Sequence, residues 1–202
     1  MVEQNSKPNQ KWPFVLAGCG GCLLVALCVG LFLFFAVRES FVFIEPSERG
    51  IIVSPYEPTG YRSELLTPGL HFLMPGEKPV IYNILRQTYV MGLNITGGPD
   101  FIEAKSSDDK KLQIDVSITY AVDPEKVLDL YKTWRDSYET GVVRPMSRGI
   151  TRDVIAHYKS DEILAKRDEV SQTIFDQLAL TFAENYLILW KVDILDIRLS
   201  NP

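Results

Sequence analysis

The chain has 202 residues, of which 46% are hydrophobic and 23% charged, and its net charge is −5. Residues 38–202 contain 19 Lys and Arg against 25 Asp and Glu, so their net charge is 19 − 25 = −6. Because nucleic acid binds basic surfaces, an acidic domain of this kind predicts no nucleic-acid partner. The 165 residues after position 37 (202 − 37) are enough for one buried core.

A long apolar stretch follows the polar N-terminal tail of residues 1–11. Residues 12–37 contain no charged side chain, with Lys11 before them and Arg38 after them. As a helix, these 26 residues would be about 39 Å long, more than the roughly 30 Å of a bilayer core. We therefore predict one transmembrane helix over 12–37, followed by a single domain over 38–202.

Small residues recur at every fourth position within this stretch. Such a stripe lets helices approach closely in lipid, where small side chains favour backbone contact. We therefore predict helix packing along this face, and Cys22 is small enough to take part in it. The stripe consists of Gly18, Cys22, Ala26 and Gly30.

All three cysteines lie in the apolar stretch, at positions 19, 22 and 28. The Cys19–Cys22 pair has the spacing of a redox or metal motif, but it lacks the soluble context or second pair that such sites need. Reversible acylation of Cys19 or Cys22 remains an alternative. Lys7 and Lys11 favour a cytoplasmic N-terminus, with the domain on the opposite side of the cell membrane.

Short β-strands are predicted first in the domain, separated by turns rich in Pro and Gly. The clearest is Leu112–Val122, where apolar and polar residues alternate as in a sheet with one buried face. Residues 106–109 before it are predicted to form a hairpin turn. The other predicted strands are Phe41–Ile44, Gly50–Ser54, Leu70–Met74, Val80–Leu85 and Phe101–Lys105.

The pattern changes to a helical period at Asp123. A short helix is predicted from Asp123 to Lys132, with Asp123 as its cap. Two longer helices with one apolar face each are predicted after it. They are Pro145–Tyr158, with Met146, Ile150, Val154 and Tyr158 on its face, and Arg167–Tyr186, with Val170, Ile174, Leu178 and Phe182 on its face.

A final strand closes the domain, with a one-residue slip in its alternation that predicts a β-bulge near Ile194–Leu195. Strands, then helices, then a closing strand indicate an α+β fold with a mostly antiparallel sheet.

Catalytic motifs are absent from the sequence. The two histidines, His71 and His157, have no metal-binding or catalytic partner pattern, and we interpret His71 as structural. We therefore expect no enzyme activity, cofactor or metal site. Arg144, Arg148 and Arg152 form a basic stripe on one helix, which is either a solvated or salt-bridged face or a lateral contact with an acidic patch on a neighbouring subunit.

Several segments in this order resemble the SPFH, or band 7, family, which includes prohibitins, stomatins and flotillins. The resemblance runs from Phe41 to Pro202 and is closest to bacterial prohibitin-like members. Its structural motif residues would be Arg49, Gly50, Pro68, Gly69 and His71. The segments are "EPSERGIIVSPYEPTG", "LLTPGLHFLMP", "KLQIDVSITYAVDPEKVLDLY", "RGITRDVIAHYKSDEILAKRDEV" and "VDILDIRLSNP".

The resemblance implies a nonenzymatic scaffold that assembles from copies of itself or a paralogue. Such assemblies enclose a patch of membrane lipids and house or restrain membrane proteins such as a protease. This chain departs from the family at Asp108–Asp109, where a Gly is usual, and after Pro202, where the family's C-terminal coiled coil is absent or truncated. The alternatives are a monomeric membrane adaptor for one partner and, from another class, a membrane-anchored thiol-dependent enzyme.

Overall fold

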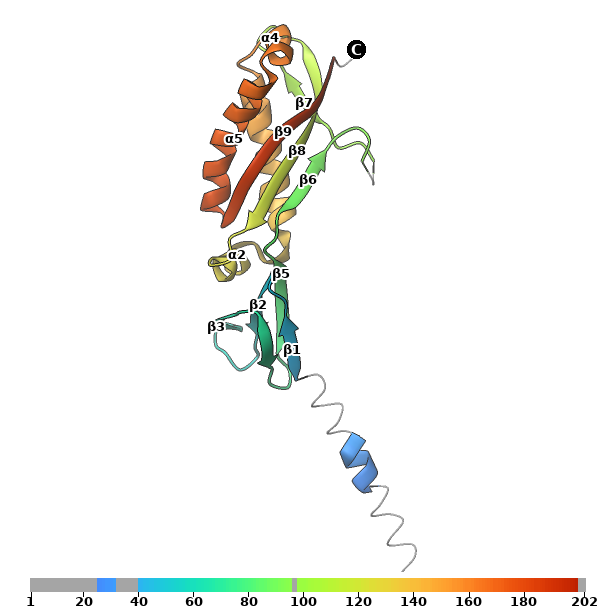
Figure 1. Ribbon diagram of the computed structural model, residues 1–202, viewed down its shortest axis with the longest axis vertical. Helices are drawn as coiled ribbons and strands as arrows, with labels where there is room; N and C mark the ends of the chain where they lie inside the picture. Colours follow the sequence, from blue (N-terminus) through green and yellow to red (C-terminus); the bar gives the residue numbers. More distant parts are fainter. Residues whose placement is uncertain (1–24, 32–39, 96–97, 200–202) are drawn as a thin grey trace, which may run out of the picture.

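The computed structural model describes residues 25–31, 40–95 and 98–199 (Figure 1). Residues 25–31 form a helix that contains Ala26 and Gly30, whereas Gly18 and Cys22 of the small-residue stripe lie outside the described residues. In these three ranges, no helix has both the length and the apolar character needed to cross a membrane.

The smaller lobe is built from two antiparallel sheets. β1 (Phe41–Ile44) pairs with β4 (Gly69–Phe72), and β2 (Glu48–Val53) lies between β3 (Tyr61–Leu66) and β5 (Lys78–Asn83). A small separate core lies between them, made of Ile44, Ile52, Leu66 and Leu73.

The larger lobe is built on the long strand β8 (Lys111–Val122). β9 (Leu187–Leu199) pairs with β8 along nearly its whole length. β6 (Gln87–Met91) and β7 (Ile102–Lys105) pair with successive parts of β8, so they share its other side. All pairs are antiparallel, which confirms the predicted α+β fold.

Helices cover one face of this sheet (Figure 1). They bury every second residue of β8 from Leu112 to Val122, as the alternation predicted. The helical elements are α2 (Val127–Trp134), a 3₁₀ turn (Arg135–Ser137), a π-helix (Glu139–Val143), α3 (Arg144–Ile155), α4 (Ser160–Ala165) and α5 (Arg167–Glu184).

The apolar face predicted for the last helix is confirmed, because Val170, Ile174, Leu178 and Phe182 are all fully buried in α5. The face predicted for α3 was wrong in part. Val154 is buried, but Met146 is exposed, and the other buried positions are Ser147, Thr151 and Ile155. Small polar side chains fill that interface, so hydrophobicity alone could not locate it.

The predicted bulge in the closing strand is confirmed. Ile194 pairs with Val116 and Asp196 with Asp115, which leaves Leu195 as the extra residue. A second bulge, not predicted, leaves Trp190 unpaired in the same way. Both extra side chains are about half exposed.

Aromatic rings join the two lobes. Tyr61 of β3 meets Tyr131 of α2 edge to face, with ring centres 5.9 Å apart. Tyr82 of β5 meets Tyr138 at 6.2 Å. The Tyr82 hydroxyl is buried and has no hydrogen-bond partner among the described residues, and this burial raises its pKa.

Candidate functional site

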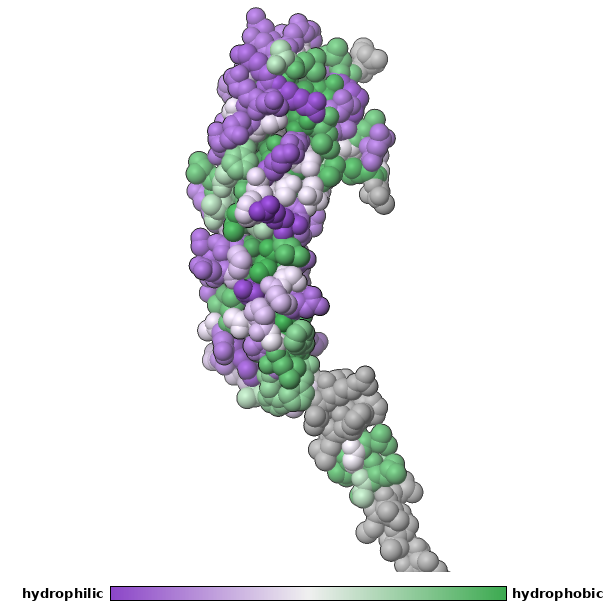
Figure 2. Space-filling view, in the orientation of Figure 1, coloured by the Kyte–Doolittle hydropathy of each residue, from purple (hydrophilic) through white to green (hydrophobic). Residues whose placement is uncertain are grey.

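Large apolar side chains gather on the outer face of the β1–β4 pair. Phe41 lies opposite Phe72 and Phe43 opposite Leu70, and the two facing rings lie 5.6 Å apart. Together with Met74 these residues form what we call the apolar tip, and each is between 48% and 67% exposed. Figure 2 shows apolar surface at this end of the domain. Such a contiguous exposed patch is typical of an interaction site.

The residues predicted as structural motifs lie beneath or beside this tip. Gly50 is buried in β2, where a Cβ atom would come within 3.0 Å of Leu66 and 3.1 Å of Ile44. Gly69 begins β4 with φ +135°, a conformation that favours glycine. The His71 ring nitrogen Nε2 lies 2.6 Å from the carbonyl oxygen of Thr67, across the turn that contains Pro68.

Arg49, the remaining motif residue, lies in β2 and donates from its guanidinium to the carbonyl of Glu48 at 2.8 Å. Its contact is therefore local, within one strand.

A buried ion pair supports the same lobe. The Arg62 guanidinium donates two hydrogen bonds to the Glu77 carboxylate, at 2.8 and 2.7 Å, and the Met74 backbone N–H donates a third at 2.8 Å. Burial alone would raise the pKa of Glu77, but these donors and the Arg62 charge outweigh it, so the pKa is lowered.

The arginine stripe lies against the segment that leads into β7. Arg144 donates to both carboxylate oxygens of Asp100, at 3.2 and 2.5 Å, and Arg148 donates to one of them at 2.8 Å. The Arg144 hydrogen bonds are the main cause of a lowered pKa at Asp100. The structure thus brings Arg144 and Arg148 together on one carboxylate of the same chain.

Backbone carbonyls at β7 are the other partners of this stripe. Arg148 donates to the carbonyls of Asp100 and Phe101, at 3.2 and 3.0 Å, and Arg152 donates to the carbonyl of Glu103 at 2.8 Å. The sequence indicated the stripe but not these acceptors, because backbone carbonyls leave no trace in side-chain patterns. Lateral subunit contact by these arginines stays a prediction.

The Asp108–Asp109 turn joins β7 to β8 as a hairpin, as predicted. Asp109 takes φ 65°, the conformation for which glycine is usual. The Asp108 carboxylate accepts hydrogen bonds from the backbone N–H and the hydroxyl of Ser160, each 2.9 Å long. Hydrogen bonds from Ser106 and Ser160 lower the pKa of Asp108. This aspartate therefore ties the hairpin to the start of α4.

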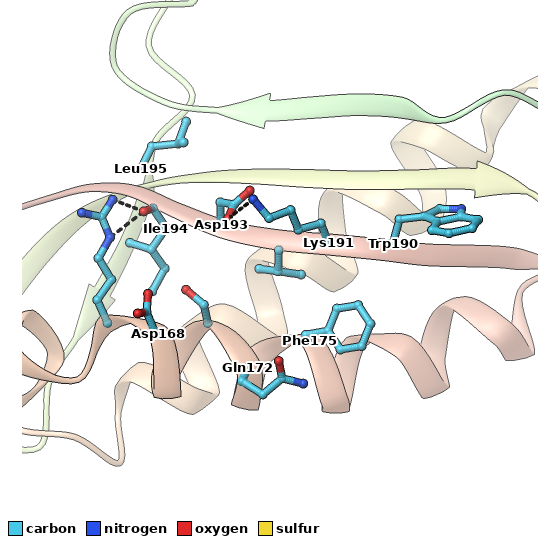
Figure 3. A pocket seen from close by; sticks show the side chains of 11 residues that line it. Asp168, Gln172, Phe175, Trp190, Lys191, Asp193, Ile194 and Leu195 are labelled. Carbon is cyan, nitrogen blue, oxygen red and sulfur yellow. Dashed lines mark hydrogen bonds and ion pairs between the residues drawn. The ribbon is translucent and has the colours of Figure 1, made fainter.

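A groove of about 630 Å³ runs between α5 and β9 (Figure 3). Phe175 and Val192 line it together with charged side chains, of which Lys191 and Asp193 pair at 2.8 Å. The Arg167 side chain donates two hydrogen bonds to the carbonyl of Ile194, one of them 2.7 Å long from Nε.

Metal-binding clusters are also missing from residues 25–31, 40–95 and 98–199, where no three His, Cys, Asp or Glu side chains converge. Cys28, the one cysteine in these ranges, is exposed and not in a disulfide. Cys19 and Cys22 lie outside them.

A family model for the SPFH domain / Band 7 family matches residues 42–201. The chain belongs to this family. The match covers both lobes, from β1 to the end of β9, and so confirms the family that the motifs indicated.

Prohibitins are among the relatives of this SPFH domain. The chain is 21% identical to Prohibitin-6, mitochondrial, of Arabidopsis thaliana over 88% of its own length and 58% of the relative. It is 25% identical to the Mitochondrial prohibitin complex protein 1 of Caenorhabditis elegans over 71% of its length and 49% of the relative. With Prohibitin-2 of Gallus gallus it shares 24% identity over 91% of its length and 58% of the relative. The chain thus spans about half the length of these proteins.

Proposed function

We propose that this SPFH protein is a membrane-anchored subunit of an oligomeric scaffold. The scaffold would organise a membrane microdomain and house or regulate membrane proteins such as a protease. Family membership supports this class of function, and one relative has a name that assigns it to a complex. Residues 12–37 would be the anchor, with the N-terminus in the cytoplasm and the domain on the opposite side of the cell membrane.

The observation that carries the proposal is the apolar tip. Its first residue, Phe41, follows the charge-free stretch of residues 12–37 by only three residues. An exposed apolar patch this close in sequence to the proposed anchor would contact the lipid surface from which the anchor emerges. The acidic remainder of the domain would then face water.

Contact between tip and lipid is tested with a fluorescent probe in reconstituted vesicles. All three native cysteines are changed to serine, and an environment-sensitive dye is attached at Leu70→Cys or, as the matched control, at Leu180→Cys. Leu70 is 67% exposed on the tip and Leu180 is 71% exposed on α5. We expect quenchers attached to lipid tails to quench the dye at position 70 and not at position 180. Equal quenching at the two positions, or none at either, would contradict the proposal that the apolar tip contacts lipid.

Assembly is tested by native mass. The full-length protein is extracted from its source membrane in a mild detergent, and the particle mass is compared with the 22.9 kDa chain. We expect a particle of many subunits, from one chain or from this chain and a paralogue. A monomer would instead favour the adaptor for a single partner, and the scaffold would have to be withdrawn.

A further inference from the structure

The larger sheet ends in exposed strands on both sides. β9 forms one edge, and within the described residues no strand pairs with its outer side. β6 and β7 form the opposite edge, beyond β8. An unpaired strand edge presents free N–H and C=O groups, which can pair with a strand of another molecule. Copies that are concentrated in one membrane would meet such edges often.

Arg148 and Arg152 occupy the outer side of β7. Their acceptors include the carbonyls of Phe101 and Glu103, which are two residues apart. Alternate carbonyls of a strand point to the same side, and β8 lies on the other side of β7. The two arginines therefore bind the carbonyls that a further strand would use.

The spacing of the two elements fits this arrangement. Arg148 and Arg152 are one turn apart on α3, about 6 Å along the helix axis. Two residues of a strand span about 6.6 Å. Each arginine therefore meets its own carbonyl. Hydrogen bonds from a charged donor are stronger than those between neutral groups, so an incoming N–H would not readily displace them.

The opposite edge carries the same kind of contact. Arg167 at the start of α5 donates twice to the carbonyl of Ile194, next to the bulge at Leu195. A bulge also makes an edge strand a poorer template for pairing. Both edges of the sheet are thus capped by arginines from the helices beside them.

We propose that Arg148 and Arg152 close the β7 edge to strand addition by the β7 edge of a second copy of this chain. In this role the two arginines act within one subunit and keep neighbouring copies from joining their sheets. The proposal concerns the sheet edge alone and holds whether or not the copies assemble as a scaffold. Removal of the arginines should then increase contact between copies. If the arginines instead formed ion pairs between subunits, their removal would decrease it.

The test uses the full-length chain in reconstituted vesicles, with the three native cysteines changed to serine. A single reporter cysteine is placed at Glu103→Cys, where the side chain is exposed on β7. A short bismaleimide reagent then measures how often two copies bring their position 103 together. The variants are Arg148→Gln with Arg152→Gln, Arg152→Gln alone, and Arg144→Gln as the control. Arg144 is in the same stripe, and it donates to the Asp100 carboxylate.

We expect a severalfold rise in cross-linked dimer for the double variant, a smaller rise for Arg152→Gln, and no change for Arg144→Gln. Circular dichroism checks that each variant is folded. If the double variant unfolds, the Arg152→Gln variant alone tests the proposal, because Arg152 is exposed. Cross-linking that stays at the background level in a folded variant would overturn the proposal. A decrease would also overturn it and would favour an ion pair between subunits.

Discussion

Two glycines eight positions apart have opposite surroundings. A Cβ atom at Gly141, in the π-helix, would lie 2.8 Å from two ring carbons of Trp134, whereas a Cβ atom at Gly149, in α3, would meet nothing within 4 Å. The Trp134 ring cannot easily move, because its indole nitrogen donates to Asn185 at 3.0 Å. The first glycine is therefore required by packing, and the second is not.

We expect Gly141→Ala to lower the free energy of unfolding by about 1–3 kcal/mol, as overpacking does. Gly149→Ala should raise it by up to about 1 kcal/mol, because alanine favours a helix interior over glycine. Urea unfolding of the two variants in the same detergent checks both signs. A loss at Gly149 as large as that at Gly141 would mean that crowding at Trp134 is not the cause.

The buried Glu77 should make stability depend on pH. Its pKa is lowered in the folded state, so its contribution is fully present above the unfolded value of about 4.3 and is lost as the pH falls through the folded value. Glu77→Gln should lower the free energy of unfolding by about 1–3 kcal/mol at neutral pH, because it leaves Arg62 without its carboxylate.

The difference between wild type and Glu77→Gln should shrink as the pH falls from the unfolded value of about 4.3 towards the lowered folded value. Urea unfolding at a series of pH values measures this change. Glu64→Gln serves as the control, since Glu64 is exposed on β3 and makes no ion pair in the described part of the chain. If the difference in free energy of unfolding between wild type and Glu77→Gln stays constant from neutral to acidic pH, the ion pair with Arg62 is not its source.

At the scale of elements, the packing of α5 and β9 was predictable, whereas α3 was predicted as a helix but its buried face only in part. α5 buries Val170, Ile174, Leu178 and Phe182, so its apolar period reports its packing directly. The bulge at Leu195 of β9 is visible in the sequence as a one-residue slip in the alternation of apolar and polar residues. α3 instead buries Ser147 and Thr151, whose hydroxyls have no hydrogen-bond partner in the described part of the chain, and its arginines bind backbone oxygens. Neither property appears in a hydrophobicity pattern.

The strands β3 and β6 were not predicted from the sequence, for a related reason. β3 begins Tyr61-Arg-Ser-Glu and has one fully buried residue, Leu66. β6 buries only Met91 completely. Strands at a sheet margin that face water on most sides lack the apolar alternation of β8. The sequence did not show that the apolar tip is exposed, because exposed and buried apolar strands have the same pattern of residues.

The buried face of α5 gives a direct test of how this helix packs. Leu178 is fully buried and Leu180, two residues later, is 71% exposed. Leu178→Ala should lower the free energy of unfolding by about 2–5 kcal/mol, the usual cost of a cavity in a core. Leu180→Ala should change it by less than about 0.5 kcal/mol. Similar losses in urea unfolding would mean that the helix packs differently from the structure.

For the whole molecule, we predict that the small-residue stripe in residues 12–37 supports association between copies. Gly18→Leu together with Gly30→Leu should weaken association in vesicles, because the larger side chains keep helix backbones apart. Energy transfer between labelled copies measures this. Cys22→Ala should have little effect and Cys22→Leu a clear one, and association that is unchanged in every variant would contradict packing along this stripe.

The pairing of β8 with β9 also determines when the domain can fold. Leu112 pairs with Leu199 and Val122 with Leu187, so the paired residues are 87 (199 − 112) and 65 (187 − 122) positions apart. Contacts between residues so distant in sequence slow folding, because a long loop must close before they form. During synthesis, β8 has only the short strands β6 and β7 beside it until β9 leaves the ribosome. One whole side of the central strand therefore stays open while the residues between β8 and β9 are made, and β9 then completes the sheet.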